Sequence, residues 1–460
     1  YVRVGNSSRN THIAGAIHLD AEAVVEQERN ICGESGFTDL KPEKRGVTYG
    51  EEAKEKVSAV SVELSAAELK QVTHVYSELP RELPHGPACR WEEVVSGKKT
   101  MEEFVGGLTD EQLAYLCIGA YKECEDMMEV IGNASISVAG AAGETTQQLK
   151  ELGTPTLVMA DGPAGLRLAK EYYKDEKGIH AIGQSAIPDS FLDFMSKPMI
   201  FFMKLFTGGN KGSKEENKIK YQYCTAIPIG TAIAQSFNTE LAEMYGDIVG
   251  SEMEMFGVHL WLAPALNIHR SIRCGRNFEY FSEDPLISGL MAAAITEGVQ
   301  KHPGCGTTIK HYAANNKELN RYTNDSQVSE RAMREIYTKG FGICVKKAQP
   351  HAVMTSYNLL NGTHTAEHKG LIEDILRAEY GYEGIVMTDW VISMMTEKNG
   401  IHRNSKARFV AAAGGDLFMP GGKKDYEDLL AGIKAGDVSE KQVKINASRV
   451  LKMARKLVIK

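Results

Sequence analysis

A repeating unit runs through the 460-residue chain from about Thr109 onward: a short apolar run, a polar cluster and a segment with helical periodicity. Six such runs start at Thr156, Val258, Thr307, Ala352, Gly384 and Asp416. Strands that alternate with helices favour a parallel sheet, and strands that are apolar throughout are buried on both faces. At this length the repeat predicts an α/β fold, a (β/α)8 TIM-like barrel rather than an open sheet.

Several segments between the runs are amphipathic with the period of a helix. They cover residues 239–256, 329–347 and 369–380, and Gly257 is the expected stop of the first. A further helix should begin after Thr109, because Thr109 and Gln112 have the spacing of a capping box. The sequence therefore predicts the helical layer that surrounds a barrel.

The first 98 residues do not follow this repeat. Residues 1–30 alternate apolar and polar side chains, which predicts half-buried strands. Two strands make no stable sheet alone, so we expect sequence before Tyr1 to complete it. Residues 31–98 are polar with scattered Gly and Pro, and we interpret them as a connector with at most short elements. The barrel is then assigned to residues 99–460, with an insertion at 171–222 that is longer than most loops.

Charge and cysteine content argue against several classes of partner. The formal net charge is -7, which disfavours nucleic acid and anionic membranes as partners. No apolar stretch approaches the roughly 20 residues of a membrane span. The 8 cysteines are scattered, with no Cys-x-x-Cys pair, which disfavours a zinc site. Such a pattern is typical of reduced thiols, so we expect a cytoplasmic protein.

Polar and aromatic side chains follow five of the apolar runs. They are Asp161, Asn267, Lys310 with His311, Ser356 with Tyr357 and Asn358, and Asp389 with Trp390. In a barrel, the active site lies at the carboxyl ends of the strands. These groups can hydrogen-bond or stack on a sugar, so their shared position predicts a carbohydrate site.

Four segments resemble the signatures of glycoside hydrolase family 3, in the order in which that family carries them. They are DGPAGLR at 161–167, GRNFEYFSEDP at 275–285, KHYAANN at 310–316 and VMTDW at 386–390. The match extends over about residues 100–460, and the first segment is similar to that of the β-glucosidase branch. The resemblance implies hydrolysis of terminal, non-reducing β-D-glucosyl residues with retention of configuration, and no metal or organic cofactor.

The resemblance also implies a role for each site residue. Asp389 would be the nucleophile, because the oxocarbenium-like transition state needs a carboxylate close to the anomeric carbon. The residues implied to bind the sugar are Asp161, Arg167, Arg276, Lys310, His311, Tyr357 and Trp390. Taken alone, an Asp in this position is more often a helix N-cap.

Structural alternatives exist for the other positions as well. Asp161 and Arg167 could form a salt bridge in a turn, and Tyr357 and Trp390 could be ordinary core residues. The acidic residues of the second signature are expected to form structural ion pairs rather than to supply a catalytic acid. They are Glu279, Glu283 and Asp284.

The catalytic acid/base is the part of the resemblance that this chain does not carry. A retaining glycosidase needs a second carboxyl group about 5 to 5.5 Å from the first. In this family that Glu comes from a domain that normally follows the barrel, and some members are circularly permuted. Residues 1–30 resemble the last strands of a fibronectin type III-like sandwich, so the chain fits the C-terminal half of a permuted enzyme. Its N-terminal half would then supply the Glu.

Two other functions remain open at this stage. The barrel could bind sugar without turning it over, or it could belong to a β-xylosidase or a glycoside phosphorylase. The apolar insertion suggests a contact with a partner domain or with a second subunit of a homo-oligomer, beside the aglycone site. The alternative is that the insertion folds back on the barrel as a helical hairpin.

Overall fold

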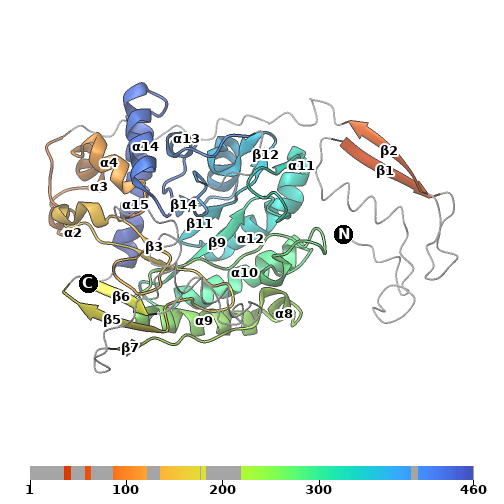
Figure 1. Ribbon diagram of the computed structural model, residues 1–460, viewed down its shortest axis with the longest axis horizontal. Coiled ribbons are helices and arrows are strands. Elements are labelled where there is room, and N and C mark those ends of the chain that lie inside the picture. Colours follow the sequence, from red (N-terminus) through yellow and green to blue (C-terminus); the bar gives the residue numbers. More distant parts are fainter. Residues whose placement is uncertain are drawn as a thin grey trace, which may run out of the picture.

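A curled sheet forms the centre of the protein (Figure 1). The computed structural model describes residues 36–42, 57–63, 86–121, 135–176, 178–182, 219–394 and 402–458. The sheet has six strands in the order β14-β11-β9-β8-β4-β3. Their bounds are β3 Gly143–Glu144, β4 Val158–Ala160, β8 Leu260–Trp261, β9 Gly306–Tyr312, β11 Ala352–Thr355 and β14 Ile385–Met387. β3 is antiparallel to β4, and the other neighbours are parallel. Five of the six predicted apolar runs therefore form parallel strands.

Two extended segments link the edges of this sheet. Leu417 forms a parallel bridge with Met387 of β14, and the next residue, Phe418, forms one with Ile118. The backbone N–H of Ala120 then donates to the carbonyl of Glu144 in β3, at 2.8 Å. The sixth predicted run, at 416–419, thus makes single bridges rather than a regular strand.

Both faces of the central strands are buried, as their apolar sequences predict. Alternate residues of one strand enter two different hydrophobic clusters: in β4, Val158 joins one and Met159 the other. Val353 and Met354 in β11 divide in the same way. Side chains alternate across a strand, so a strand buried on both faces needs apolar residues at consecutive positions.

Helices cover the outside of the sheet, with α8, α9 and α10 on one side in Figure 1 and α4, α13 and α14 on another. Their bounds are α2 Trp91–Val95, α3 Met101–Gly106, α4 Asp110–Leu116, α8 Gly230–Ala234, α9 Thr239–Phe256, α10 Pro285–Gln300, α12 Lys339–Ala348, α13 Ala407–Ala412, α14 Lys423–Ala435 and α15 Glu440–Leu457. Short 3-10 helices occupy η2 Gln147–Leu152, η4 Asn277–Glu279 and η6 Thr365–Glu367.

Helix ends follow the sequence closely. α9 has the predicted bounds and ends at Gly257, whose φ of 73° is a left-handed conformation that glycine adopts readily. α4 begins with the predicted capping box, in which Thr109 accepts from the N–H of Gln112 and Gln112 caps the N–H of Thr109. The helix predicted at 329–347 differs, because α11 Glu330–Ala332 and α12 are separated by the π-helix η5 Met333–Tyr337. Residues 370–379 also form a π-helix, η7 Gly370–Glu379.

Three smaller sheets lie outside the centre. β1 Gly36–Pro42 pairs with β2 Val57–Glu63, so the segment predicted as a connector contains paired strands. The short strands β10 Asp325–Ser326, β12 Leu359–Leu360 and β13 Thr363–His364 form a second sheet. The described ends of the insertion form the third, from β5 Glu171–Asp175, β6 Gly178–Ile182 and β7 Lys220–Tyr221. The strands predicted within 1–30 and the apolar core of the insertion lie outside the described residues.

Candidate active site

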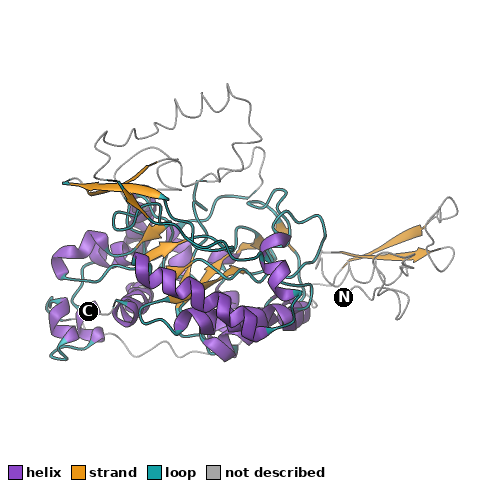
Figure 2. Ribbon diagram, turned by 90° about the horizontal axis from the view of Figure 1, so that it is seen from below, coloured by secondary structure: helices purple, strands orange, loops and turns teal. Residues whose placement is uncertain are grey.

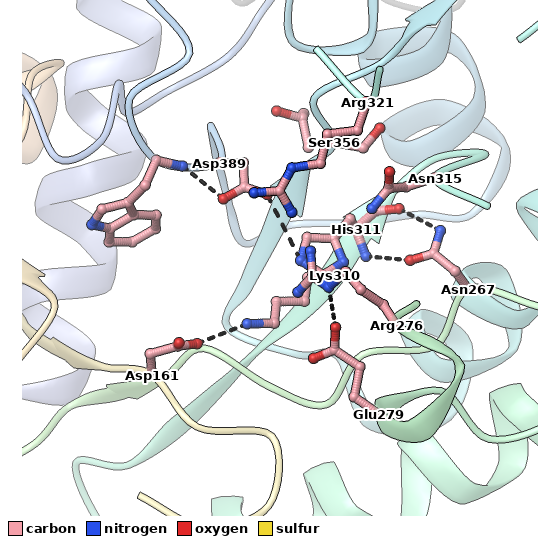
Figure 3. A network of polar contacts seen from close by, with 12 residues as sticks. Asp161, Asn267, Arg276, Glu279, Lys310, His311, Asn315, Arg321, Ser356 and Asp389 are labelled. Carbon is pink, nitrogen blue, oxygen red and sulfur yellow. Dashed lines mark hydrogen bonds and ion pairs between the residues drawn. The ribbon is translucent and has the colours of Figure 1, made fainter. Parts of the chain in front are cut away.

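The predicted site residues come together where the central strands end. Asp161 follows β4, Lys310 and His311 lie in β9, and Asp389 comes two residues after β14. Figure 3 shows the side chains of Asp161, Arg276, Lys310, His311 and Asp389 converging on one space. Parallel strands bring their carboxyl ends to the same edge, which explains why residues so distant in sequence meet.

Asp161 is held by two cations. Its Oδ1 lies 2.8 Å from Lys310 Nζ, and its Oδ2 lies 2.5 Å from Arg167 Nη2. Burial alone would raise the pKa of Asp161, but the Lys310 and Arg167 charges outweigh it and hold that pKa well below its usual range. Asp161 is therefore a permanent carboxylate, with a cation on either side.

The turn between Asp161 and Arg167 requires glycine. The backbone N–H of Arg167 donates to the carbonyl of Asp161 at 2.8 Å, which closes the loop. Gly162 has a φ of 119°, and a Cβ there would lie 2.0 Å from the carbonyl oxygen of Gly165. A side chain at Gly162 would thus force Arg167 away from Asp161.

Asp389 is buried, with one oxygen bound and one unbound. Oδ1 accepts the backbone N–H of Trp390 at 2.7 Å. Oδ2 accepts no hydrogen bond of good geometry from the described residues and lies 3.7 Å from His311 Nε2. Burial raises the pKa of Asp389, while the charges of Arg276 and Lys310 oppose that rise. A buried carboxylate oxygen left unpaired is costly unless a ligand uses it, so Oδ2 is available to bind a ligand.

His311 is fixed in a neutral form. Asn267 holds its backbone on both sides: Oδ1 accepts the His311 N–H, and Nδ2 donates to the His311 carbonyl, each at 2.8 Å. Burial and the charges of Arg276, Lys310 and Arg321 lower the pKa of His311 well below its usual range. A neutral imidazole can both donate and accept, which suits it to a sugar hydroxyl.

Arg276 and Glu279 form a buried ion pair through Arg276 Nε. This is the structural role predicted for Glu279, and it leaves the rest of the guanidinium free to face the cluster around Asp389 (Figure 3). Asp284 was also expected in an ion pair. It is instead the N-cap of α10, because its Oδ1 accepts the N–H of Leu286 at 2.8 Å.

Tyr357 and Trp390 border the same space. The charge of Asp389, added to burial, raises the pKa of Tyr357 well above its usual range. The Arg321 guanidinium lies over the Tyr357 ring, 4.7 Å from its centroid. Trp390 Nε1 donates to the carbonyl of Ala142 at 2.9 Å, which fixes the indole beside Asp389.

Asn267 and Arg321 belong to this network but were not among the predicted site residues. Asn267 was noticed at the end of a strand, but an Asn there has many structural uses. Arg321 lies in a loop without hydrophobic periodicity, and only the general rule that cations accompany buried carboxylates could have suggested it. Its guanidinium also contacts Glu318 and the hydroxyl of Tyr322, both at 2.9 Å.

Among the described residues, no group of three or more His, Cys, Asp or Glu side chains could hold a metal ion. None of the helices in the described ranges is long and apolar enough to cross a membrane.

Comparison with known proteins points to one family. Residues 213–453, slightly more than half of the chain, match the Glycosyl hydrolase family 3 N terminal domain. A β-glucosidase of Ruminococcus albus is 31% identical over 98% of this chain and 42% of its own length. β-Glucosidase A of Butyrivibrio fibrisolvens is 35% identical over 66% of this chain and 29% of its own.

Solved structures of β-glucosidases also resemble this chain. β-Glucosidase 3B from Thermotoga neapolitana, in complex with glucose, superposes with a TM-score of 0.61 and 35% identity, over 77% of this chain and 42% of that one. A β-glucosidase from Paenibacillus barengoltzii gives a TM-score of 0.65 at 29% identity, over 92% of this chain and 40% of that one. The chain thus spans less than half the length of these relatives. With the family domain matched over more than half of its residues, this chain belongs to glycoside hydrolase family 3.

Proposed function

We propose that this chain forms the glucose-binding and nucleophile-bearing barrel of a retaining β-glucosidase. The observation that carries the proposal is the buried, unpaired Oδ2 of Asp389, which faces a cluster of sugar-binding groups. The bridges from Leu417 and Phe418 to the sheet edges support closure of that sheet into a (β/α)8 barrel. The relatives named above are β-glucosidases, which favours a glucoside as the substrate.

The cluster suits the non-reducing glucose unit. The Asp161 carboxylate can accept hydrogen bonds from sugar hydroxyls, and charge-assisted bonds of this kind are the strong ones. Lys310, Arg276 and His311 can donate to other hydroxyls, and Trp390 offers an apolar face. Arg167 fixes Asp161, and Tyr357 lies close enough to Asp389 to affect its ionisation.

The chemical step needs Asp389 ionised. Arg276 and Lys310 favour the carboxylate against the opposing effect of burial. Oδ2 attacks the anomeric carbon, and the glycosyl–oxygen bond breaks as the leaving oxygen takes a proton from the acid/base. Water, deprotonated by the same acid/base, then hydrolyses the glycosyl ester and restores the β configuration.

We further propose that the acid/base Glu is supplied by sequence outside this chain. Three other carboxylates contact cations of the network and are already paired: Asp161 with Lys310 and Arg167, Glu279 with Arg276, and Glu318 with Arg321. A carboxylate whose pKa is depressed, as that of Asp161 is, makes a poor proton donor.

Azide rescue tests the nucleophile in the complete enzyme. Asp389→Gly should lose hydrolysis of 2,4-dinitrophenyl β-glucoside, and azide should restore substrate consumption by attacking from the vacated face to give the α-glucosyl azide. Asp161→Gly is the matched control, because it removes a binding carboxylate of the same cluster and azide should not rescue it. Rescue of both variants, or of neither, would count against the assignment.

A further inference from the structure

The small sheet formed by β5, β6 and β7 carries an aromatic face that the proposed mechanism does not use. The sheet grows out of the loop that follows β4, the loop that also carries Asp161 and Arg167. In Figure 2 it stands with the loops, at the edge of the molecule away from the cluster of helices. Its antiparallel register is fixed by the pairing of Tyr173 with His180 and of Glu171 with Tyr221.

One face of this sheet gathers four aromatic rings and two carboxylates. Directly paired residues and residues two apart on a strand share a face. Strand pairing places Glu171, Tyr173, Asp175, His180, Ile182 and Tyr221 on this face, and Tyr223 joins them by stacking on Tyr221. Side-chain contacts agree: Tyr173 stacks on His180 at 4.8 Å, Tyr221 on Tyr223 at 6.0 Å, and His180 Nε2 lies 2.8 Å from Asp175 Oδ1. We call Glu171, Tyr173, Asp175, His180, Tyr221 and Tyr223 the aromatic face.

The two most exposed rings are held outward by a buried anchor. Tyr221 is 58% exposed and Tyr223 is 63% exposed, whereas Gln222 between them is 6% exposed. The Gln222 N–H donates to the carbonyl of Lys170 at 3.0 Å, and its Nε2 donates to the carbonyl of Ala139 at 2.7 Å. The backbone is thus fixed while two parallel rings, 12° apart in plane, face outward. Rigid aromatic side chains of this kind bind at a low entropic cost.

The chemistry of the aromatic face matches a pyranose ring. A β-linked glucosyl unit presents apolar C–H faces and a rim of hydroxyls. Tyrosine offers an apolar ring with a polar tip, and carboxylates accept charge-assisted hydrogen bonds from hydroxyls. Glu171 and Asp175 also give the face a negative charge, which disfavours anionic ligands and leaves neutral sugars acceptable.

The aromatic face is also within reach of the catalytic cluster. Glu171 is four residues beyond Arg167, so their Cα atoms lie at most about 14 Å apart even if the chain between them is fully extended. Arg167 is itself bound to Asp161 in the proposed glucose subsite. A saccharide that extends outward from the scissile bond can therefore meet this sheet.

We propose that the aromatic face binds outer glucosyl units of β-linked oligosaccharides, on the leaving-group side of the scissile bond. This inference rests on the proposed β-glucosidase function and names its preferred substrate class: oligosaccharides rather than small aryl glucosides.

The test uses the complete enzyme and the double variant Tyr221→Ala/Tyr223→Ala. We expect kcat/KM on cellotetraose or laminaritetraose to fall about tenfold, the scale of losing an aromatic anchor from an interface. Activity on 4-nitrophenyl β-glucoside, which lacks the outer units, should not change. Tyr172→Ala is the matched control, because Tyr172 lies in the neighbouring strand β5 but on the opposite face of the sheet. Tyr221→Phe/Tyr223→Phe keeps the rings and should retain oligosaccharide activity.

Calorimetric titration of cellotetraose into the Asp389→Ala background separates binding from turnover. If the enzyme hydrolyses no glucoside, the proposed function fails, and the titration still decides whether the aromatic face binds sugar. Equal losses on both substrate classes, or equal losses in the Tyr172→Ala control, would overturn the inference. Unchanged sugar affinity in the double variant would also overturn the inference. If the double variant alters the assembly state while sugar affinity stays unchanged, the aromatic face is a protein contact and the inference fails.

Discussion

Lys310 joins the proposed glucose-binding carboxylate to the proposed nucleophile, so Lys310→Met perturbs both at once. Its ammonium group is buried and lies 2.8 Å from Asp161 Oδ1. Removing one member of a buried charge pair costs about 2–5 kcal/mol. Arg167 still binds the same carboxylate, so we expect the lower end, about 2 kcal/mol of unfolding free energy.

The catalytic effect should be larger than the folding effect. A hydrogen bond from the ammonium to a sugar hydroxyl is worth about 1.5–3 kcal/mol, and Asp161 also loses its position. Together these terms predict at least about a hundredfold loss in kcat/KM at neutral pH.

The pH profile gives the sharpest readout of Lys310→Met. Lys310 lowers the pKa of Asp389, so its removal raises that pKa. Asp389 acts as a carboxylate, so the acidic limb of kcat/KM against pH should move to higher pH. Asp161 contributes stability that is present above its unfolded pKa of about 3.9 and lost as pH falls below it. The stability difference between wild type and variant should therefore shrink in acid.

Lys444→Met is the matched control for this experiment. Lys444 is also a buried lysine in an ion pair, 2.6 Å from Glu440 on α15, far along the chain from the site. Urea denaturation should show a destabilisation in both variants, and only Lys310→Met should shift the acidic limb. An unshifted limb in Lys310→Met would refute the electrostatic link between Lys310 and Asp389.

Two further changes test the sugar contacts and the framework. Asp161→Asn keeps the size but removes the charge, and should lower kcat/KM on 4-nitrophenyl β-glucoside more than about tenfold, since hydrogen bonds to charged groups are about twice as strong as neutral ones. A wild-type rate in this variant would mean that Asp161 only stabilises the turn to Arg167 and does not bind the sugar. Asp416→Asn should cost about 3 kcal/mol in urea denaturation, because Asp416 is fully buried and binds Arg377 Nη2 at 2.6 Å and the Val386 N–H at 2.7 Å. Glu111→Gln is the control, because it weakens an exposed ion pair with Lys434 and should leave stability unchanged. Similar losses of stability in Asp416→Asn and Glu111→Gln would mean that the buried contacts of Asp416 do not stabilise the fold.

The parts of the fold that sequence predicts well are those set by local rules. α9 ends where Gly257 allows a left-handed residue, and β11 spans the predicted apolar run Ala352–Thr355. The strand-end positions also place Asp161, His311 and Asp389 on one edge, because that step needs only the parallel topology.

The parts that sequence misses depend on long-range contacts. The run at 416–419 makes single bridges rather than a regular strand. Its Asp416 binds the Val386 N–H and Arg377, partners distant in the sequence that no local pattern reveals. The strands at the two ends of the insertion pair with each other, although Glu171 and Tyr221 lie fifty residues apart in the chain. No local pattern predicts such a pairing. Arg321 is held at the site by contacts with Glu318, Tyr322 and Tyr357, which no local pattern reveals.

The most direct test of the central claim is to trap the glycosyl–enzyme intermediate. The complete enzyme is incubated with 2,4-dinitrophenyl 2-deoxy-2-fluoro-β-glucoside, digested, and mapped by peptide mass spectrometry. The fluorine slows both steps, and the good leaving group preserves the first, so the ester accumulates. We predict a single fluoroglucosyl label on Asp389. A label on another carboxylate, with Asp389 unmodified, would contradict the proposed mechanism.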